Sequence, residues 1–148
     1  MSSLDPDLIL YYSRGREWDR LDRTGPLEGT RTKQIISRRL EGGSLAVVDI
    51  GGGPGYYACW LAAEGHRVQL VDPVPLHIEQ AEARARELGV TLDGTHLALA
   101  DRLPFENESF DVGLLLGPLY HLAERDARFA ALAEALRVLR PGGMLFAA

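Results

Sequence analysis

The sequence is poor in cysteine, in basic charge and in long apolar runs, and each shortage excludes a class of protein. Cys59 is the only cysteine, so no intrachain disulfide can form and a reducing compartment, the cytoplasm, is favoured. The 16 Lys and Arg residues are outnumbered by 21 Asp and Glu residues, whereas binding to nucleic acid needs a basic face. No apolar run is long enough to cross a bilayer, and the polar, acidic N-terminus is not typical of a signal peptide. We therefore expect a cytoplasmic protein whose partner is neither nucleic acid nor a membrane.

Charged and reactive side chains do not gather into an obvious site either. The basic residues near the N-terminus alternate with acidic ones, a pattern that indicates a solvated helix face: Arg14, Arg16, Glu17, Asp19, Arg20, Asp22 and Arg23. His66, His77 and His96 are scattered and lack the spacing of metal ligands, so no metal is expected. Cys59 lies among apolar residues, where a small buried hydrophobe is a better interpretation than a nucleophile.

What the sequence does contain is a glycine cluster, around which the chain is organised. An apolar run ends in Asp49 and Ile50, glycines follow at 51, 52, 53 and 55, and a helix-compatible segment begins at Tyr56. This order predicts a strand, a tight turn and a helix, and glycines let backbone N–H groups approach a ligand closely. The G-x-G-x-G spacing indicates a nucleotide-like ligand, but Tyr56 stands where a dinucleotide site requires a third small residue. A tight turn with no ligand is the alternative.

Strand-like and helix-like segments alternate along the rest of the chain. Strands are expected at residues 45–50, 68–72, 95–100, 110–116 and 144–148. Helices are expected at residues 4–23, 30–40 and 56–64, in a segment opened by Pro73 and Pro75, and along a stripe from Phe129 to Leu139. The alternation predicts an α/β fold with a five-stranded parallel sheet and helices on both faces. We expect a single domain, residues 1–148, with a helical N-terminal cap at 1–44 and a ligand-binding core at 45–148.

Acidic residues mark the ends of the predicted strands. Asp72 follows the start of the glycine loop by about twenty residues, the spacing at which an acid binds ribose hydroxyls, although it could instead cap the next helix. Asp101 could accept a hydrogen bond from an exocyclic amine such as that of adenine, or could simply form a turn. Asp49 could orient the amides of the loop, attract a cationic group of the ligand, or only support the loop. Because the strands are parallel, we expect these acids on one rim of the sheet.

Taken in order, these motifs resemble the class I S-adenosylmethionine-dependent methyltransferases of the broad methyltransferase type 11 kind. The residues that carry the resemblance are VVDIGGGPG at 47–55, VD at 71–72, ADRLPF at 100–105, SFDV at 109–112 and LRPGG at 139–143. The resemblance implies a doubly wound, Rossmann-like sheet and S-adenosylmethionine as cofactor. It also implies that the family domain continues beyond the fifth strand with two more strands. We therefore expect a C-terminally truncated chain whose fifth strand leaves an open edge, which a second copy or another partner could cover.

The resemblance further implies roles for several site residues. Asp72 would bind the ribose, and Asp101 with the backbone of Arg102 would read adenine. Pro73 would pack against the adenine ring, and the loop at Gly51 and Gly53 would hold the methionine end of the cofactor. Tyr12 lies where the N-terminal helix of the family closes over the cofactor. The full set of expected cofactor-binding residues is Tyr12, Asp49, Gly51, Gly52, Gly53, Asp72, Pro73, Asp101, Arg102, Leu116 and Gly117.

The expected activity is methyl transfer to an O, N or C nucleophile of a small molecule. Such a transfer needs alignment and exclusion of water more than a fixed catalytic triad. His121 is the candidate to take a proton from the acceptor, and a packing role for this histidine is the alternative. Two other functions stay open: a cofactor-binding module without turnover, and a nicotinamide-dependent oxidoreductase.

Overall fold

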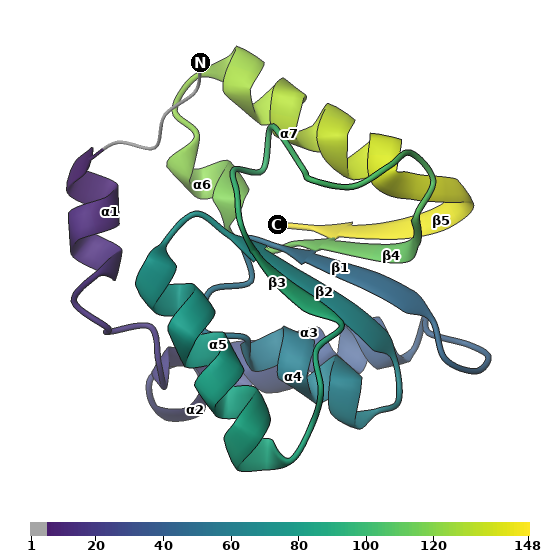
Figure 1. The fold of residues 1–148 in the computed structure, drawn as a ribbon, viewed down its shortest axis with the longest axis horizontal. Helices are drawn as coiled ribbons and strands as arrows, with labels where there is room; N and C mark the ends of the chain where they lie inside the picture. The colour runs from purple at the N-terminus through teal and green to yellow at the C-terminus, as the bar shows by residue number, and fades with distance from the viewer. Residues whose placement is uncertain (1–5) are drawn as a thin grey trace.

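A five-stranded parallel sheet forms the centre of the structure, a computed structural model that describes residues 6–148 (Figure 1). The strands are β1 (Ala46–Ile50), β2 (Arg67–Asp72), β3 (Gly94–Leu97), β4 (Phe110–Leu115) and β5 (Leu139–Ala147). They pair in the order β3-β2-β1-β4-β5, and every pairing is parallel. The chain therefore winds outward from β1 to one edge, returns to β4, and winds to the other edge. The strand order reverses between β1 and β4, which is where open parallel sheets bind their ligands.

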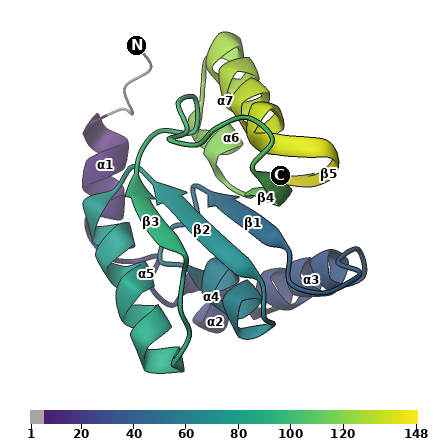
Figure 2. The same cartoon turned by 45° about the vertical axis from the view of Figure 1, so that its right-hand side comes forward.

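Helices cover both faces of this sheet. On one face lie α2 (Arg20–Arg23), α3 (Pro26–Ser37), α4 (Tyr56–Ala63) and α5 (Pro75–Leu88), and on the other lie α6 (Pro118–His121) and α7 (Arg125–Val138). Figure 2 shows the same two layers turned by 45°, and α1 (Pro6–Tyr12) stands apart beside the upper end of α5. The predicted doubly wound α/β fold is therefore confirmed.

The composition of β1 explains why it takes the central place. Its five residues are all buried, and they contact opposite layers in alternation. Val47 packs into the cluster formed with α2, α3, α4 and α5, whereas Val48 and Ile50 pack into the cluster formed with α7. A strand that is apolar on both faces is stable only between two layers of helices.

The predicted helix at residues 4–23 is wrong, although its first two residues lie outside the described part of the chain. The structure has α1 and α2 instead, joined by a turn at Gly15, whose φ of 71° belongs to the left-handed region. The second helix begins at Pro26 rather than at residue 30, because proline is well suited to the first turn of a helix.

Two strands also differ from the prediction. β3 ends at Leu97, three residues early, so residues 98–100 form a loop. β5 begins at Leu139 rather than at residue 144, because the segment at Pro141 joins the strand through an irregularity in its register with β4. β5 lies at the sheet edge with β4 as its single neighbour, and its covering by a second copy or a partner stays a prediction. Within residues 6–148, no helix has the length and apolar character that a membrane crossing requires.

Candidate functional site

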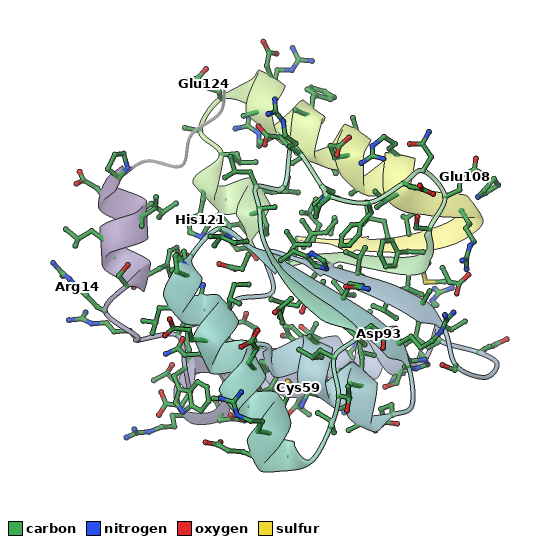
Figure 3. The ribbon with its side chains drawn as sticks, in the orientation of Figure 1. Arg14, Cys59, Asp93, Glu108, His121 and Glu124 are labelled. Atoms are coloured by element: carbon green, nitrogen blue, oxygen red, sulfur yellow. The ribbon has the colours of Figure 1, made fainter. Side chains whose placement is uncertain are left out.

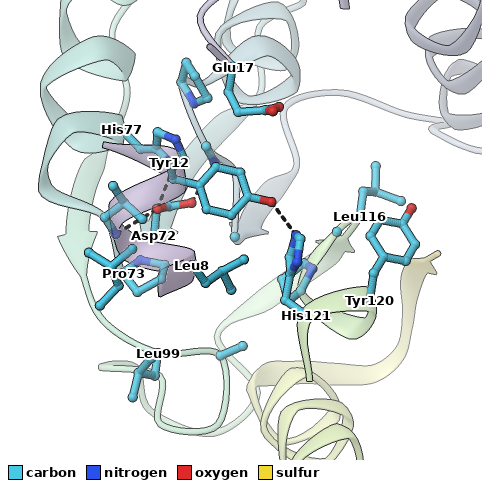
Figure 4. A pocket seen from close by; sticks show the side chains of 18 of the residues that line it. Leu8, Tyr12, Glu17, Asp72, Pro73, His77, Leu99, Leu116, Tyr120 and His121 are labelled. Carbon is cyan, nitrogen blue, oxygen red and sulfur yellow. Dashed lines mark hydrogen bonds and ion pairs between the residues drawn. The ribbon is translucent and has the colours of Figure 1, made fainter. Parts of the chain in front are cut away.

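A cavity of about 480 Å³ opens at the carboxyl ends of β1, β2 and β4, where the strand order reverses (Figure 4). α1 lies on one side of it and α6 on the other. The lining comes from residues 51, 53 and 54, from 72–74 and 77, from 98–100, from 116–118 and 120–122, and from 8, 9, 12, 17, 20 and 28. Segments far apart in the sequence therefore meet in one cavity, of the size usual for small-molecule sites.

The glycine loop lines this cavity with backbone, because there is no room for a side chain at Gly51. A Cβ on Gly51, whose φ is 69°, would come within 2.3 Å of the Pro118 ring. The loop amides, however, are engaged by the protein itself. Gly51 and Gly52 donate to the Val71 carbonyl at 2.7 and 3.2 Å, and Gly53 donates to Asp72. The loop thus brings backbone close to a ligand, but these three N–H groups are not free donors as the sequence led us to expect.

Asp72 holds the loop and the start of α5 together. Its Oδ2 accepts the Gly53 N–H at 2.9 Å, and its Oδ1 accepts the Val74 N–H at 2.9 Å and lies 3.0 Å from His77 Nδ1. The side chain is nearly buried but lines the cavity. A carboxylate has about four acceptor positions, so one remains for a ligand hydroxyl. The support role and the ribose role are therefore compatible, and the ribose role stays a prediction.

Asp49 lies beneath the loop and not on the cavity wall. Its residue is 2% exposed, and its Oδ2 has no hydrogen-bond partner. Burial, and then the charge of Asp72, raises the pKa of Asp49 to about 7. A Cβ on Gly52 would come within 2.7 Å of this Oδ2, so the loop covers the carboxyl tightly. Neither Asp49 nor Gly52 lines the cavity, and this arrangement favours loop support for Asp49.

The segment after β3 presents apolar atoms to the cavity. Ala98, Leu99 and Ala100 line it, whereas Asp101 and Arg102 do not. The physical reason is that β3 ends at Leu97, so the chain has already turned before it reaches Asp101. The adenine role of Asp101 and Arg102 stays a prediction that the cavity lining does not support.

Tyr12 and His121 meet across the mouth of the cavity. The Tyr12 hydroxyl, from α1, hydrogen-bonds His121 Nε2, from α6 (Figure 4). Burial raises the pKa of Tyr12 to about 12 and lowers the pKa of His121, so at neutral pH the phenol keeps its proton and the imidazole is neutral. In the tautomer that carries its proton on Nδ1, Nε2 accepts the Tyr12 O–H and is a base in the cavity.

Eight of the predicted site residues therefore share one cavity: Tyr12, Gly51, Gly53, Asp72, Pro73, Leu116, Gly117 and His121. Cys59 lies apart from His121, on the helix below the sheet in Figure 3. It is buried, and burial raises the pKa of its thiol to about 11, as for a packing residue. Among residues 6–148, no group of His, Cys, Asp or Glu side chains is arranged to hold a metal ion.

Among the lining residues that sequence reasoning missed are three charged side chains and a histidine: Glu17, Arg20, Glu28 and His77. The assignment of Glu17 and Arg20 to a solvated helix face is wrong, because the turn at Gly15 folds this segment back onto the cavity. His77 is buried, contacts Asp72 and stacks edge-to-face on Tyr12 with centroids 5.2 Å apart. Its position two residues after the start of α5, itself opened by Pro75, was the available sequence clue.

Comparisons with known proteins show the family of the chain. The methyltransferase domain family matches residues 47–143. A ubiquinone biosynthesis O-methyltransferase of Methylocella silvestris is 31% identical over 170 residues, covering 99% of this chain and 64% of the relative. The chain thus spans less than two thirds of that protein's length.

Solved structures similar to this chain include a methyltransferase and a protein that shares the fold. A structure of SAM-dependent methyltransferase from Methanosarcina mazei is 28% identical with a TM-score of 0.68, covering 75% of this chain and 55% of that one. The PH0226 protein of Pyrococcus horikoshii has a TM-score of 0.79 over 93% of this chain and 61% of its own. At 20% identity, this second likeness shows the fold alone.

Proposed function

Because the chain belongs to the methyltransferase domain family, we propose that it binds S-adenosylmethionine in the cavity between α1 and α6 and transfers the methyl group to a small molecule. The O, N or C nucleophile of that acceptor lies beside His121. One observation carries the proposal: the glycine loop, Asp72 and the Tyr12–His121 pair line a single cavity at the switch point of the sheet.

The residues present fit the cofactor. Gly51 allows close approach of the backbone, and the remaining acceptor position of Asp72 suits a ribose hydroxyl. Pro73 and Leu99 offer apolar contact to the adenine ring. The acidic side chains of Glu17 and Asp72 suit a ligand that carries positive charge.

The contribution of the protein to the reaction is alignment and proton transfer. When bound, the cofactor supplies a methyl group on a positively charged sulfur. His121 Nε2 would accept the proton of an acceptor hydroxyl that takes the place of the Tyr12 hydroxyl. Tyr12, on α1, also covers the cavity and excludes water from it.

A calorimetric titration with S-adenosylhomocysteine, followed by a radiolabelled methyl-transfer assay on phenols, catechols and amines, tests the proposal. We expect saturable binding, and we expect His121→Gln to keep binding while product formation falls roughly 100-fold or more. His66→Gln is the matched control, since His66 accepts the Leu45 N–H near the opposite ends of the strands.

Folded protein that gives no saturable heat would contradict the proposal. Binding without product from any acceptor would instead favour the alternative of a cofactor-binding module without turnover. Binding of NADH in place of S-adenosylhomocysteine would favour the oxidoreductase alternative.

A further inference from the structure

Three charged residues of the cavity are not used by the proposed reaction. Glu17, Arg20 and Glu28 come from the N-terminal segment and α3, and all three line the cavity. Glu17 also lies near the reacting groups, because its charge contributes to the pKa values of both Tyr12 and His121. The cluster therefore belongs to the same cavity as the Tyr12–His121 pair.

The hydrogen bonds of the cluster place both signs of charge side by side. Arg20 Nε donates to Glu17 at 2.9 Å, while Nη1 and Nη2 donate to the two Glu28 oxygens at 3.0 and 3.1 Å. These bonds use three of the five N–H groups of a guanidinium. The hydrogen bond with Glu28 raises the pKa of Arg20, so the guanidinium stays charged.

The segment that carries the cluster is fixed against the core. Arg84, on α5, donates to the Trp18 carbonyl and stacks over the Trp18 ring at 4.9 Å from the centroid. Its Nη1 also lies 3.6 Å from an Asp22 oxygen. Glu17 directly precedes Trp18 and Arg20 follows it by two residues, so this anchor sets their position at the cavity wall.

We propose that Glu17 and Arg20 form a clamp for a zwitterionic α-amino acid group, the methionine end of the cofactor. The inference rests on the proposed function and deepens it. A ligand carboxylate takes the Nη1–Nη2 fork of Arg20, and a ligand ammonium takes the Glu17 carboxylate. A planar guanidinium fork beside a carboxylate suits both charges of a zwitterion. Arg20 and Glu17 supply these two groups, and Arg20 Nε lies 2.9 Å from Glu17 Oε2.

Glu28 occupies the position of the ligand carboxylate in this structure. Its side chain is 53% exposed, so it can turn into water when another carboxylate takes the fork. Exchange of one carboxylate for another leaves the hydrogen bonding of Arg20 unchanged, and an exposed ion pair of this kind contributes little to stability. Glu28 therefore holds the guanidinium in place until the ligand arrives.

Two ligands that differ only in the amino acid part test the clamp. S-adenosylhomocysteine has this part, and 5′-methylthioadenosine has a methyl group in its place. For Arg20→Gln we expect the dissociation constant of S-adenosylhomocysteine to rise roughly 10- to 100-fold, the loss of a charge-assisted bidentate contact, with 5′-methylthioadenosine binding unchanged. For Glu28→Gln we expect no weakening of either ligand, because only the competing carboxylate is lost.

Arg23→Gln is the matched control. Arg23 lies on the same short helix, is 77% exposed, pairs with Asp19 and is absent from the cavity lining, so both ligands should bind this variant as they bind the parent protein. If Arg20→Gln does not fold, Glu17→Gln takes its place, with the same selective weakening expected.

Unchanged S-adenosylhomocysteine binding in a folded Arg20→Gln protein would overturn the clamp. Equal weakening of both ligands would also overturn it, because Arg20 would then act only through the structure of the N-terminal segment. Failure of the parent protein to bind either ligand would contradict the proposed function itself, and this outcome differs from both.

Discussion

The buried carboxyl of Asp49 should make the stability of the protein fall as the pH rises from about 4 to about 7. Asp49 is central in β1 and 2% exposed, and its Oδ2 has no partner beneath the glycine loop. Burial raises the pKa of Asp49 to about 7, so the folded protein keeps a proton that the unfolded chain loses near pH 4. Replacement by asparagine keeps the shape of the side chain and removes the titration.

The sign and the size of this pH effect follow from the difference in protons bound by the folded and the unfolded states. Between pH 4 and 7 the folded state binds more protons at Asp49 than the unfolded state, so its stabilising contribution is complete below the unfolded pKa and is lost as the pH rises through the folded pKa. Each pH unit in this window changes the free energy of unfolding by about 1.4 kcal/mol. From pH 5 to pH 8, Asp49 should therefore cost the folded protein about 2–3 kcal/mol relative to Asp49→Asn.

Urea unfolding followed by tryptophan fluorescence at pH 5 and pH 8 measures this difference for the parent and Asp49→Asn. All other ionisable groups are present in both proteins, so their contributions cancel in the comparison. Asp111→Asn is the control, since hydrogen bonding by the Ala46 N–H and pairing with Arg140 lower the pKa of Asp111 and move its titration out of this window. A difference between parent and Asp49→Asn that stays constant from pH 5 to pH 8 would refute the reasoning.

Three further predictions concern the loop, the core and the base. Gly55→Ala should destabilise by roughly 2–4 kcal/mol in urea unfolding, because φ is 81° and the new Cβ meets the Ala81 Cβ at 2.9 Å. Gly42→Ala, at φ 95° with open space around it, should lose only about 1–2 kcal/mol. Leu114→Ala should lower the free energy of unfolding by about 2–5 kcal/mol, since this fully buried side chain lies in the core cluster with residues of α2, α3, α4 and α5. A small effect would mean that the core collapses around the gap. The acid limb of kcat/KM should lie below pH 6.5 because burial lowers the pKa of His121, and an identical limb in His121→Gln would exclude this base.

The fold could be predicted because its decisive residues are local. The apolar run of β1 requires helices on both faces, and the glycines after Ile50 end it in a turn that no other residue would allow. The strand ends were less predictable because they depend on partners. Residues 139–143 contain Pro141 and two glycines, yet they belong to β5, where Leu139 pairs with Phe110 before the register shifts. The apolar residues 98–100 lie beyond Leu97, which pairs with Asp72, the last residue of β2, so no strand remains beside them.

The site was predictable where a residue follows directly from a strand. Asp72, Pro73, Leu116 and Gly117 lie at the ends of β2 and β4, and the parallel sheet brings such ends together. Asp101 failed this logic because its strand ends early. The charged cluster could not be predicted, because it depends on a single backbone conformation at Gly15.

The backbone conformation at Gly15 gives the cavity two walls of different chemistry, one from the sheet and one from the N-terminal segment. The sheet side offers glycine backbone, apolar side chains and an acid whose hydrogen bonds are nearly complete, which suits a nucleoside but has no cation to bind a carboxylate. The N-terminal segment brings Arg20 and Glu17 from outside the sheet, together with Tyr12 on the preceding helix. A ligand that contacts both sides would bind α1 and α2 to the core, since α1 has no buried residue of its own. Hydrogen exchange in α1 should therefore slow on addition of S-adenosylhomocysteine and much less on addition of 5′-methylthioadenosine.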